Sequence, residues 1–133
     1  MERSTTVPPP PALDGAWVPV AASVGASPLC VAQLRVRYLL LRAGGYRIVD
    51  RSNRVVDRGH YRLDAARSPP AIDITGDAGP HAGKCMLGVY ELRGDELTLC
   101  YDLERTVRPA NLRPRRDQPL LRITYVRAAE VSA

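Results

Sequence analysis

Apolar and polar residues alternate along much of this chain with the period of two that is typical of β-strands. The alternating segments lie between about residues 16 and 126, and short stretches rich in glycine, proline, asparagine and aspartate separate them. About eight strands joined mostly by short turns are the pattern of an up-and-down antiparallel barrel. We therefore predict an all-β fold with a single barrel, and a length of 133 residues fits one such domain.

The turn that the sequence marks most clearly is Gly94-Asp95, because glycine followed by aspartate suits a two-residue hairpin turn. This turn fixes a register in which one face of the hairpin is entirely apolar or aromatic, and a slip of one residue would destroy that separation. We also expect Gly88 to leave room for the ring of Tyr101. The predicted partners are Arg93 with Glu96, Leu92 with Leu97, Tyr90 with Leu99, and Gly88 with Tyr101.

One segment has helical rather than strand signals. Ser27 suits a helix N-cap and Pro28 suits the first helical position. A short helix of one or two turns is therefore predicted over residues 29–34, between the first and second strands.

The chain contains six tyrosines and no phenylalanine, and each tyrosine falls on the apolar side of an alternating segment. If these sides face one interior, the barrel encloses a space lined by aliphatic carbon and phenol hydroxyls, which suits a ligand pocket. Trp17 is expected mainly to close one end of the barrel by packing, and secondarily to touch a ligand. The predicted ligand-binding residues are Trp17, Tyr38, Tyr46, Tyr61, Tyr90, Tyr101 and Tyr125.

Two further predicted strands contribute side chains to the interior. In the first of them the alternation places Val36, Tyr38 and Leu40 on one side. In the second it places Val55, Asp57, Gly59, Tyr61 and Leu63 together, so that a carboxylate falls on an apolar side. Three placements of Asp57 stay open: at the barrel rim in water, turned outward by a bulge, or inside the barrel, which is the least expected because a buried charge is costly.

Few residues carry obvious chemistry. His60 points away from the proposed interior, whereas His81 lies in a glycine-rich connection near a barrel mouth, where it could meet a ligand or simply be a polar loop residue. Cys30, Cys85 and Cys100 match no zinc or redox spacing, so we expect free thiols, with Cys85 and Cys100 on the outer face. The sequence predicts no metal site and no cofactor.

The chain divides into three parts by composition. Residues 1–12 are rich in proline and are expected to form a disordered tail, residues 13–127 the barrel, and residues 128–133 a C-terminal tail. No apolar run is long enough to span a membrane, and the start has no apolar signal core. We therefore expect a cytoplasmic protein with no membrane partner.

The net charge of +5 comes from 18 arginines, one lysine and 14 acidic residues. One cluster lies in a loop over residues 103–119 that is rich in arginine and proline, and it could bind phosphate or nucleic acid. A solvated loop is the favoured interpretation, because no aromatic residue lies among these arginines to stack on bases, and nucleic acid is not an expected partner. The cluster comprises Arg105, Arg108, Arg113, Arg115 and Arg116.

A series of motifs between residues 13 and 127 resembles a known family. They are Leu13-x-Gly15-x-Trp17, Gly59-x-Tyr61-x-Leu63-Asp64, Ile72-Asp73, Gly79-Pro80, Gly83-Lys84, Gly88-x-Tyr90-x-Leu92-x-Gly94-Asp95-x-Leu97 and Cys100-Tyr101. Their order resembles the lipocalin-like family of uncharacterised bacterial domains first noted in planctomycetes, and the resemblance weakens over residues 103–119. It implies a lipocalin-like barrel, and the family brings no established activity or site residue.

Three functions follow as hypotheses. The first is the binding of a small hydrophobic or aromatic molecule inside the barrel. The second is a cofactor-independent cyclase or isomerase of natural-product biosynthesis, in which Tyr90 or Tyr101 polarises a carbonyl and Asp57 or His81 moves a proton. The third is an interaction or scaffold domain with a filled core. A homodimer is a further option if the barrel closes imperfectly and leaves edge strands to cover.

Overall fold

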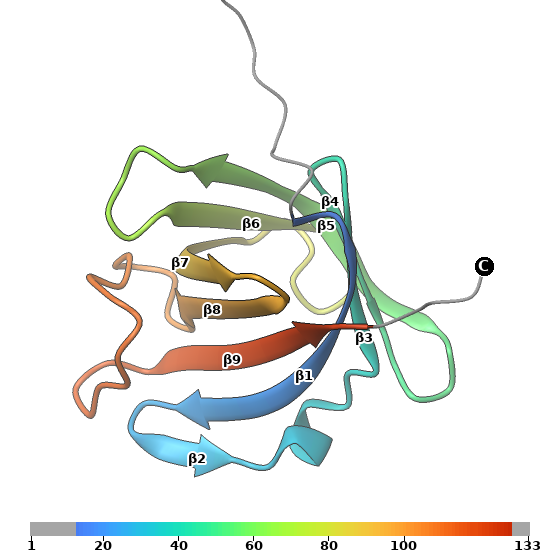
Figure 1. Ribbon diagram of the computed structural model, residues 1–133, viewed down its shortest axis with the longest axis horizontal. Helices are drawn as coiled ribbons and strands as arrows, with labels where there is room; N and C mark the ends of the chain where they lie inside the picture. Colours follow the sequence, from blue (N-terminus) through green and yellow to red (C-terminus); the bar gives the residue numbers. More distant parts are fainter. Residues whose placement is uncertain (1–12, 129–133) are drawn as a thin grey trace, which may run out of the picture.

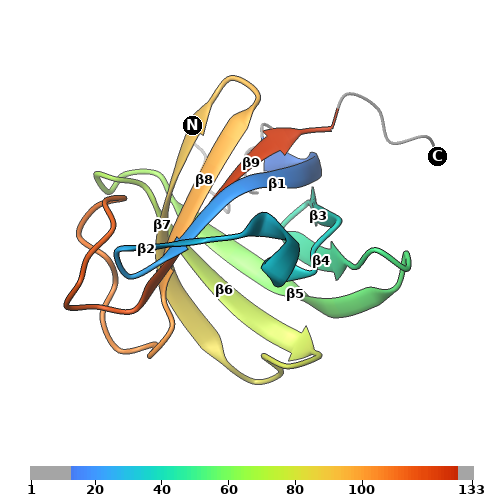
Figure 2. The ribbon, with the colours of Figure 1, turned by 90° about the horizontal axis from the view of Figure 1, so that it is seen from below.

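Eight antiparallel strands close into a barrel in the computed structural model, which describes residues 13–128 (Figures 1 and 2). Each strand pairs with the next one around the barrel, and the last pairs with the first, so the barrel itself has no free edge. The predicted all-β barrel is confirmed. The barrel strands are β1 (Gly15–Val24), β3 (Tyr38–Arg42), β4 (Gly45–Val49), β5 (Val55–Asp64), β6 (Ala71–Ala78), β7 (Cys85–Arg93), β8 (Glu96–Asp102) and β9 (Leu120–Arg127).

A ninth strand, β2 (Ser27–Leu29), pairs only with the end of β1. The turn before it passes through Gly25, whose φ of +59° suits glycine. The predicted helix is therefore shorter than expected: Ser27 and Pro28 lie in β2, and a 3-10 turn follows at Val31–Leu34. Pro28 lies in an edge strand, where its missing N–H costs little. Because the barrel closes, the reason given for a homodimer applies, within residues 13–128, only to this short strand.

The hairpin of β7 and β8 has the predicted register. Gly94 has a φ of +57° and begins the two-residue turn, and Arg93 pairs with Glu96. Gly88 pairs with Tyr101, and a Cβ atom added to Gly88 would lie 3.1 Å from Cβ of Tyr101 and 2.9 Å from the Cys100 carbonyl oxygen. The absence of a side chain at Gly88 thus leaves room for Tyr101, although the nearest atom of that residue is its Cβ and not the ring that the sequence predicted.

Trp17 packs in the core at the end of the barrel where β1 begins. Its side chain is fully buried, and its indole Nε1 donates a hydrogen bond of 3.0 Å to the carbonyl oxygen of Leu13. The guanidinium of Arg127 lies 4.3 Å from the centre of the indole ring, a cation–π contact. The expectation that Trp17 closes this end by packing agrees with these contacts.

The predicted inner side of β3 is wrong. Leu39 pairs with Ile48 and Leu41 with Tyr46, and these four side chains point inward, so Tyr38 and Leu40 point outward. The cause is the run of three leucines after Tyr38, which offers an apolar residue to the interior in either phase. The ring of Tyr38 instead lies 5.1 Å below the guanidinium of Arg37.

The arginine- and proline-rich loop over residues 103–119 covers part of the outside of the barrel. Leu112 from this loop packs on a buried cluster of Val89, Cys100 and Leu120. Cys100 therefore lies on the outer face, as predicted, but is buried there, and burial raises its pKa to about 11. Arg108 fastens the loop to β6 through an ion pair of 2.6 Å with Asp73.

Asp102, at the end of β8, holds the start of this loop. Its carboxylate accepts hydrogen bonds from the backbone N–H groups of Glu104, Thr106 and Val107, at 3.0 to 3.1 Å, and from the Thr106 hydroxyl. Burial acts to raise the pKa of Asp102, but these hydrogen bonds outweigh burial, and the pKa lies below its ordinary value.

We expect the Asp102→Asn variant to be less stable than the wild type at pH 7 by about 1.5–3 kcal/mol, because four donors lose a charged acceptor. A carboxyl whose pKa is lower in the folded state stabilises the fold above its unfolded pKa, and this contribution is lost as the pH falls through the folded pKa. Urea unfolding from pH 7 to pH 3 should therefore show the difference between the two proteins shrinking below about pH 4. A difference that stays constant over this range would contradict the role of Asp102.

Candidate functional site

The barrel interior contains a cavity of about 50 Å³. At roughly 10–15 Å³ for each water, this space holds about three to five water molecules. Most of its wall is apolar, and its polar groups are a carboxylate, an imidazole and tyrosine hydroxyls. The apolar residues are Leu39, Leu41, Ile48, Ile72, Ile74, Met86 and Leu99, and the others are Tyr46, Asp57, Tyr61, His81, Tyr101 and Tyr125.

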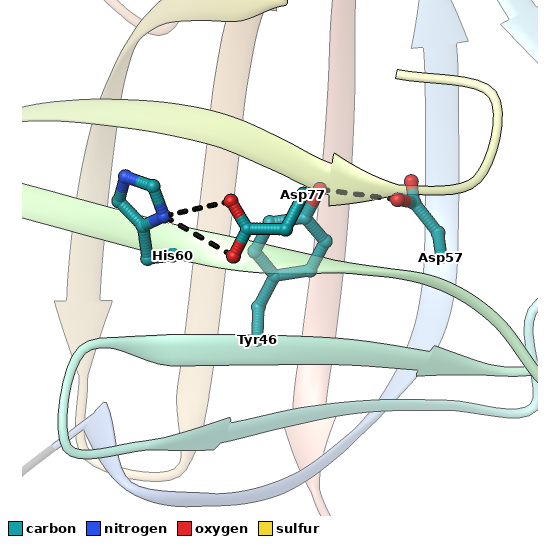
Figure 3. A network of polar contacts seen from close by, with 4 residues as sticks. All are labelled: Tyr46, Asp57, His60 and Asp77. Atoms are coloured by element: carbon teal, nitrogen blue, oxygen red, sulfur yellow. Dashed lines mark hydrogen bonds and ion pairs between the residues drawn. The ribbon is translucent and has the colours of Figure 1, made fainter. Parts of the chain in front are cut away.

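Asp57 lies inside the barrel, the placement that the sequence made least expected. Its side chain is only 6% exposed, and two donors compensate its burial. The Tyr46 hydroxyl donates to Oδ1 at 3.1 Å (Figure 3), and Nδ1 of His81 lies 3.0 Å from Oδ2. The rim placement and the outward placement are both wrong, because hydrogen bonds with Tyr46 and His81 offset the cost of burying the charge. The alternation alone could not identify these two partners.

β5 has a bulge next to Asp57, but the residue that the bulge inserts is Val56 and not Asp57. Ile48 pairs with Asp57 while Val49 pairs with Val55, so Val56 is the extra residue in β5. Val55 and Val56 are consequently both exposed, although Val55 was predicted on the inner side. The bulge changes the phase of the valines and leaves Asp57 facing inward.

The loop between β6 and β7 brings His81 to Asp57, and glycines make this possible. A Cβ atom on Gly76 would overlap the carbonyl oxygen of His81, which shows how closely the loop folds back on the strand. Gly79 has a φ of +94°, and a Cβ there would lie 2.6 Å from the Val56 carbonyl oxygen. His81 is 38% exposed, so it lies between the cavity and solvent, at the mouth.

The electrostatics of the site keep its phenols protonated. Burial first, and then the charge of Asp57, raise the pKa of both Tyr46 and Tyr101 far above the ordinary value. A carboxylate can only accept, so Nδ1 of His81 donates the hydrogen bond to Asp57. In the neutral tautomer with this arrangement, Nε2 carries a lone pair. The cavity is thus lined by protonated phenols, and the His81 imidazole lies at its mouth.

The structure brings together some of the predicted site residues and separates others. Tyr46, Tyr61, Tyr101 and Tyr125 line the cavity with Asp57 and His81. Tyr90 and Trp17 are buried in the core but do not line it, and Tyr38 points outward. His60 points away from the interior, as predicted, and its Nδ1 contacts Asp77 at 3.1 Å on the outer surface (Figure 3).

The tyrosines deeper in the interior differ in their partners. The Tyr61 hydroxyl is buried and has no hydrogen-bond partner of ordinary geometry within residues 13–128. Burial raises its pKa, the charge of Asp14 adds to the rise, and the backbone of Gly44 opposes it. Burial also raises the pKa of Tyr125, and Tyr101 adds to the effect.

The sequence did not reveal the contact between Asp57 and His81, which lie 24 residues apart. The signal that the sequence offered was the glycine-rich segment around His81. In the structure, these glycines let the segment fold closely onto β5 and β6. Over residues 13–128, no three His, Cys, Asp or Glu side chains are grouped so that they could hold a metal ion. In the same part of the chain, no helix has the length and apolarity to span a membrane.

Comparisons with family models, with curated proteins and with solved structures found no match to this chain. The site is therefore interpreted from its own geometry. That geometry is a small apolar cavity with a hydrogen-bonded carboxylate, imidazole and phenol at one end.

Gly59 offers a test of how the site is held. A Cβ atom there would overlap the Thr75 carbonyl oxygen and lie 2.6 Å from Cε2 of Tyr46, so the Tyr46 ring would have to leave Asp57. We expect Gly59→Ala to lower the free energy of unfolding in urea by about 1–3 kcal/mol or more. Gly45→Ala is the matched control in the neighbouring strand, because its Cβ would lie 3.4 Å from the nearest atom, the Arg42 carbonyl oxygen. Equal losses in both variants would show that the ring does not depend on Gly59.

Proposed function

We propose that the barrel binds a small molecule whose apolar part enters the cavity and whose polar group lies at the mouth. The observation that carries this proposal is the asymmetry of the cavity: aliphatic side chains form most of its wall, while Asp57 and His81 are joined by hydrogen bonding at one end. Binding sites for small molecules commonly combine an apolar wall with a few polar groups that set orientation.

The volume of the cavity limits the ligand. Pockets for drug-sized molecules measure about 300–1,000 Å³, whereas this cavity measures about 50 Å³. A ligand of a few heavy atoms fits without rearrangement, and a folded polyketide or terpenoid does not. The cyclase hypothesis therefore finds no support in the volume of the site.

The polar end selects the ligand's chemistry. Tyr101 keeps its proton, and its hydroxyl forms no hydrogen bond within residues 13–128, so it can donate to a ligand oxygen. His81 offers the Nε2 lone pair to a ligand donor or proton. A small molecule with a carbonyl or ether oxygen next to an apolar group matches these features.

A domain with a filled core, used only as a scaffold, is the competing interpretation, and the small cavity favours it. The buried carboxylate argues against it, because an apolar residue at position 57 would avoid the cost of desolvating a charge.

We also propose that the chain belongs to the lipocalin-like family that its motifs resemble. The barrel supports this proposal, since it is the fold that the resemblance implies.

A second function, proton transfer, is favoured by one specific contact. Hydrogen bonding between Asp57 and Nδ1 of His81 orients the imidazole, so that Nε2 can act as a general base toward a ligand in the cavity. Nε2 would remove a proton from the carbon next to a carbonyl, the C–H electrons would form the enolate double bond, and the carbonyl π electrons would move to oxygen. Tyr101 would donate to that oxygen, and return of the proton would complete an exchange or an isomerisation.

The binding proposal predicts that butanone, cyclopentanone and tetrahydrofuran perturb the protein at the cavity. In an NMR titration with ¹⁵N-labelled protein, at least one of them should shift the amides of Met86, Leu99 and Tyr101 in a saturable way. Tyr101→Phe should weaken that binding about 2- to 12-fold through the loss of one hydrogen bond.

The matched control is His60→Gln, because His60 lies on the outer surface. Its affinity for the probe should equal that of the wild type, while its melting temperature reports that the barrel is intact. The proposal is sunk if none of the three probes shifts the cavity amides, or if Tyr101→Phe and the control bind alike.

The proton-transfer function predicts exchange of the α-hydrogens of butanone for deuterium in D₂O, followed by proton NMR. The wild type should exceed the rate of a buffer that contains an equal concentration of imidazole. His81→Gln should remove about 99% of the excess rate, because a positioned base contributes at least about a hundredfold. His60→Gln should keep it; a wild-type rate no higher than that of imidazole excludes this function and leaves the binding proposal unaffected.

A further inference from the structure

The positive charge of the chain is concentrated in one segment. Residues 35–62 contain eight arginines and two aspartates, whereas the rest of the chain contains eleven basic and twelve acidic residues. The segment thus carries +6, and the remainder of the chain −1, out of a total of +5. Figure 1 shows that this segment forms β3, β4 and β5, which lie side by side in the barrel wall.

Neither aspartate of the segment forms an ion pair with one of its arginines within residues 13–128. Asp57 lies inside the barrel, and Asp50 accepts hydrogen bonds from the backbone N–H groups of Ser52 and Arg54 in the turn after β4. All eight arginines of the segment are exposed. The outer face of β3, β4 and β5 is therefore strongly positive.

Three of these arginines surround a hollow on this face. Arg47 of β4 lies directly opposite Arg58 of β5, and Arg42 of β3 lies opposite Gly45. Gly45 is an outward position without a side chain, so it leaves a gap between the arginines. The hollow measures about 690 Å³ and is lined by Leu40, Arg42, Ala43, Gly45, Tyr46, Arg47, Arg58, Gly59 and Asp77.

Among the residues that the structure describes, the arginines of the hollow have no partner of opposite charge. Within residues 13–128, Arg42, Arg47 and Arg58 form no ion pair and no side-chain hydrogen bond. The one carboxylate that lines the hollow, Asp77, lies 3.1 Å from Nδ1 of His60. Like charges directly opposite each other across two strands destabilise a sheet, so folding gains nothing from Arg47 facing Arg58.

We propose that this hollow binds the phosphate group of a small anionic ligand. The guanidinium fork matches phosphate oxygens in pairs, and three permanent positive charges favour an anion that carries more than the single charge of a carboxylate. A nucleic acid is the less suitable occupant, because the only outward tyrosine beside the arginines, Tyr38, is covered by Arg37 and cannot stack on bases.

The test is calorimetric titration with inorganic pyrophosphate at low ionic strength. The wild type should bind it, and the double variant Arg47→Gln/Arg58→Gln should bind at least about tenfold more weakly, through the loss of two charged donors. The matched control is Arg113→Gln/Arg116→Gln, which removes the same charge from exposed positions outside the segment. The control should bind as the wild type does.

The double variant should also melt no lower than the wild type in the absence of phosphate, because it removes a like-charge pair. If both double variants bind pyrophosphate equally weakly, the loss of net charge alone explains the effect, and the proposal is overturned. Absence of binding by the wild type overturns it as well. Tighter binding of a DNA duplex than of pyrophosphate, dependent on Arg47 and Arg58, would overturn it in favour of nucleic acid.

A last comparison identifies the source of the phosphate. Co-sedimentation with vesicles of phosphatidylglycerol in phosphatidylcholine, set against phosphatidylcholine alone, tests a lipid headgroup. Binding that needs the anionic lipid and is displaced by pyrophosphate supports the proposal with a headgroup as the ligand. Pyrophosphate binding without vesicle binding supports it with a free phosphate compound.

Discussion

A carboxylate inside an apolar barrel must find hydrogen-bond donors, and the interior of this protein is arranged around that requirement. Asp57 obtains two donors, the phenol of Tyr46 and the imidazole of His81. Each donor needs the backbone to come close. The Tyr46 ring lies against Gly59, the His81 loop folds back on Gly76, and Gly79 of the same loop lies against Val56 and Asp57. The surroundings of one buried carboxylate thus account for three glycines in two segments of the chain.

The need to supply donors to the Asp57 carboxylate also makes the two ends of the barrel chemically different. At the end where β1 begins, Trp17 and Leu13 pack without leaving a charged group in the interior. Asp57, near the start of β5, and His81, between β6 and β7, lie toward the opposite end. The cavity therefore meets solvent at its polar end, where His81 is partly exposed.

The sequence predicted the fold well because each strand has an apolar side and the turns are marked. The register of β7 and β8 could be derived residue by residue, since Gly94-Asp95 fixes the turn and one slip would reverse every side chain. The alternation failed where it was ambiguous, as in the leucine run after Tyr38, or where a bulge changed its phase, as at Val56. The contact between Asp57 and His81 could not be predicted from the alternation, because alternation shows which face of a strand a side chain is on and not where a loop folds.

Alternation along β4 and β5 also explains how one pair of strands can serve two sites. Tyr46 and Asp57 point into the barrel, and the residues that follow them in the chain, Arg47 and Arg58, point out. The phenol of Tyr46 and the carboxylate of Asp57 lie on the inner side of the sheet, and the guanidinium groups of the hollow lie on its outer side. The two sets of side chains share strands but form no hydrogen bond or ion pair with one another within residues 13–128. Truncating an outer arginine leaves the inner hydrogen bonds in place, whereas a change at Gly59 moves the Tyr46 ring. The interior and exterior sites can therefore be altered separately, which makes the function of each one open to its own experiment.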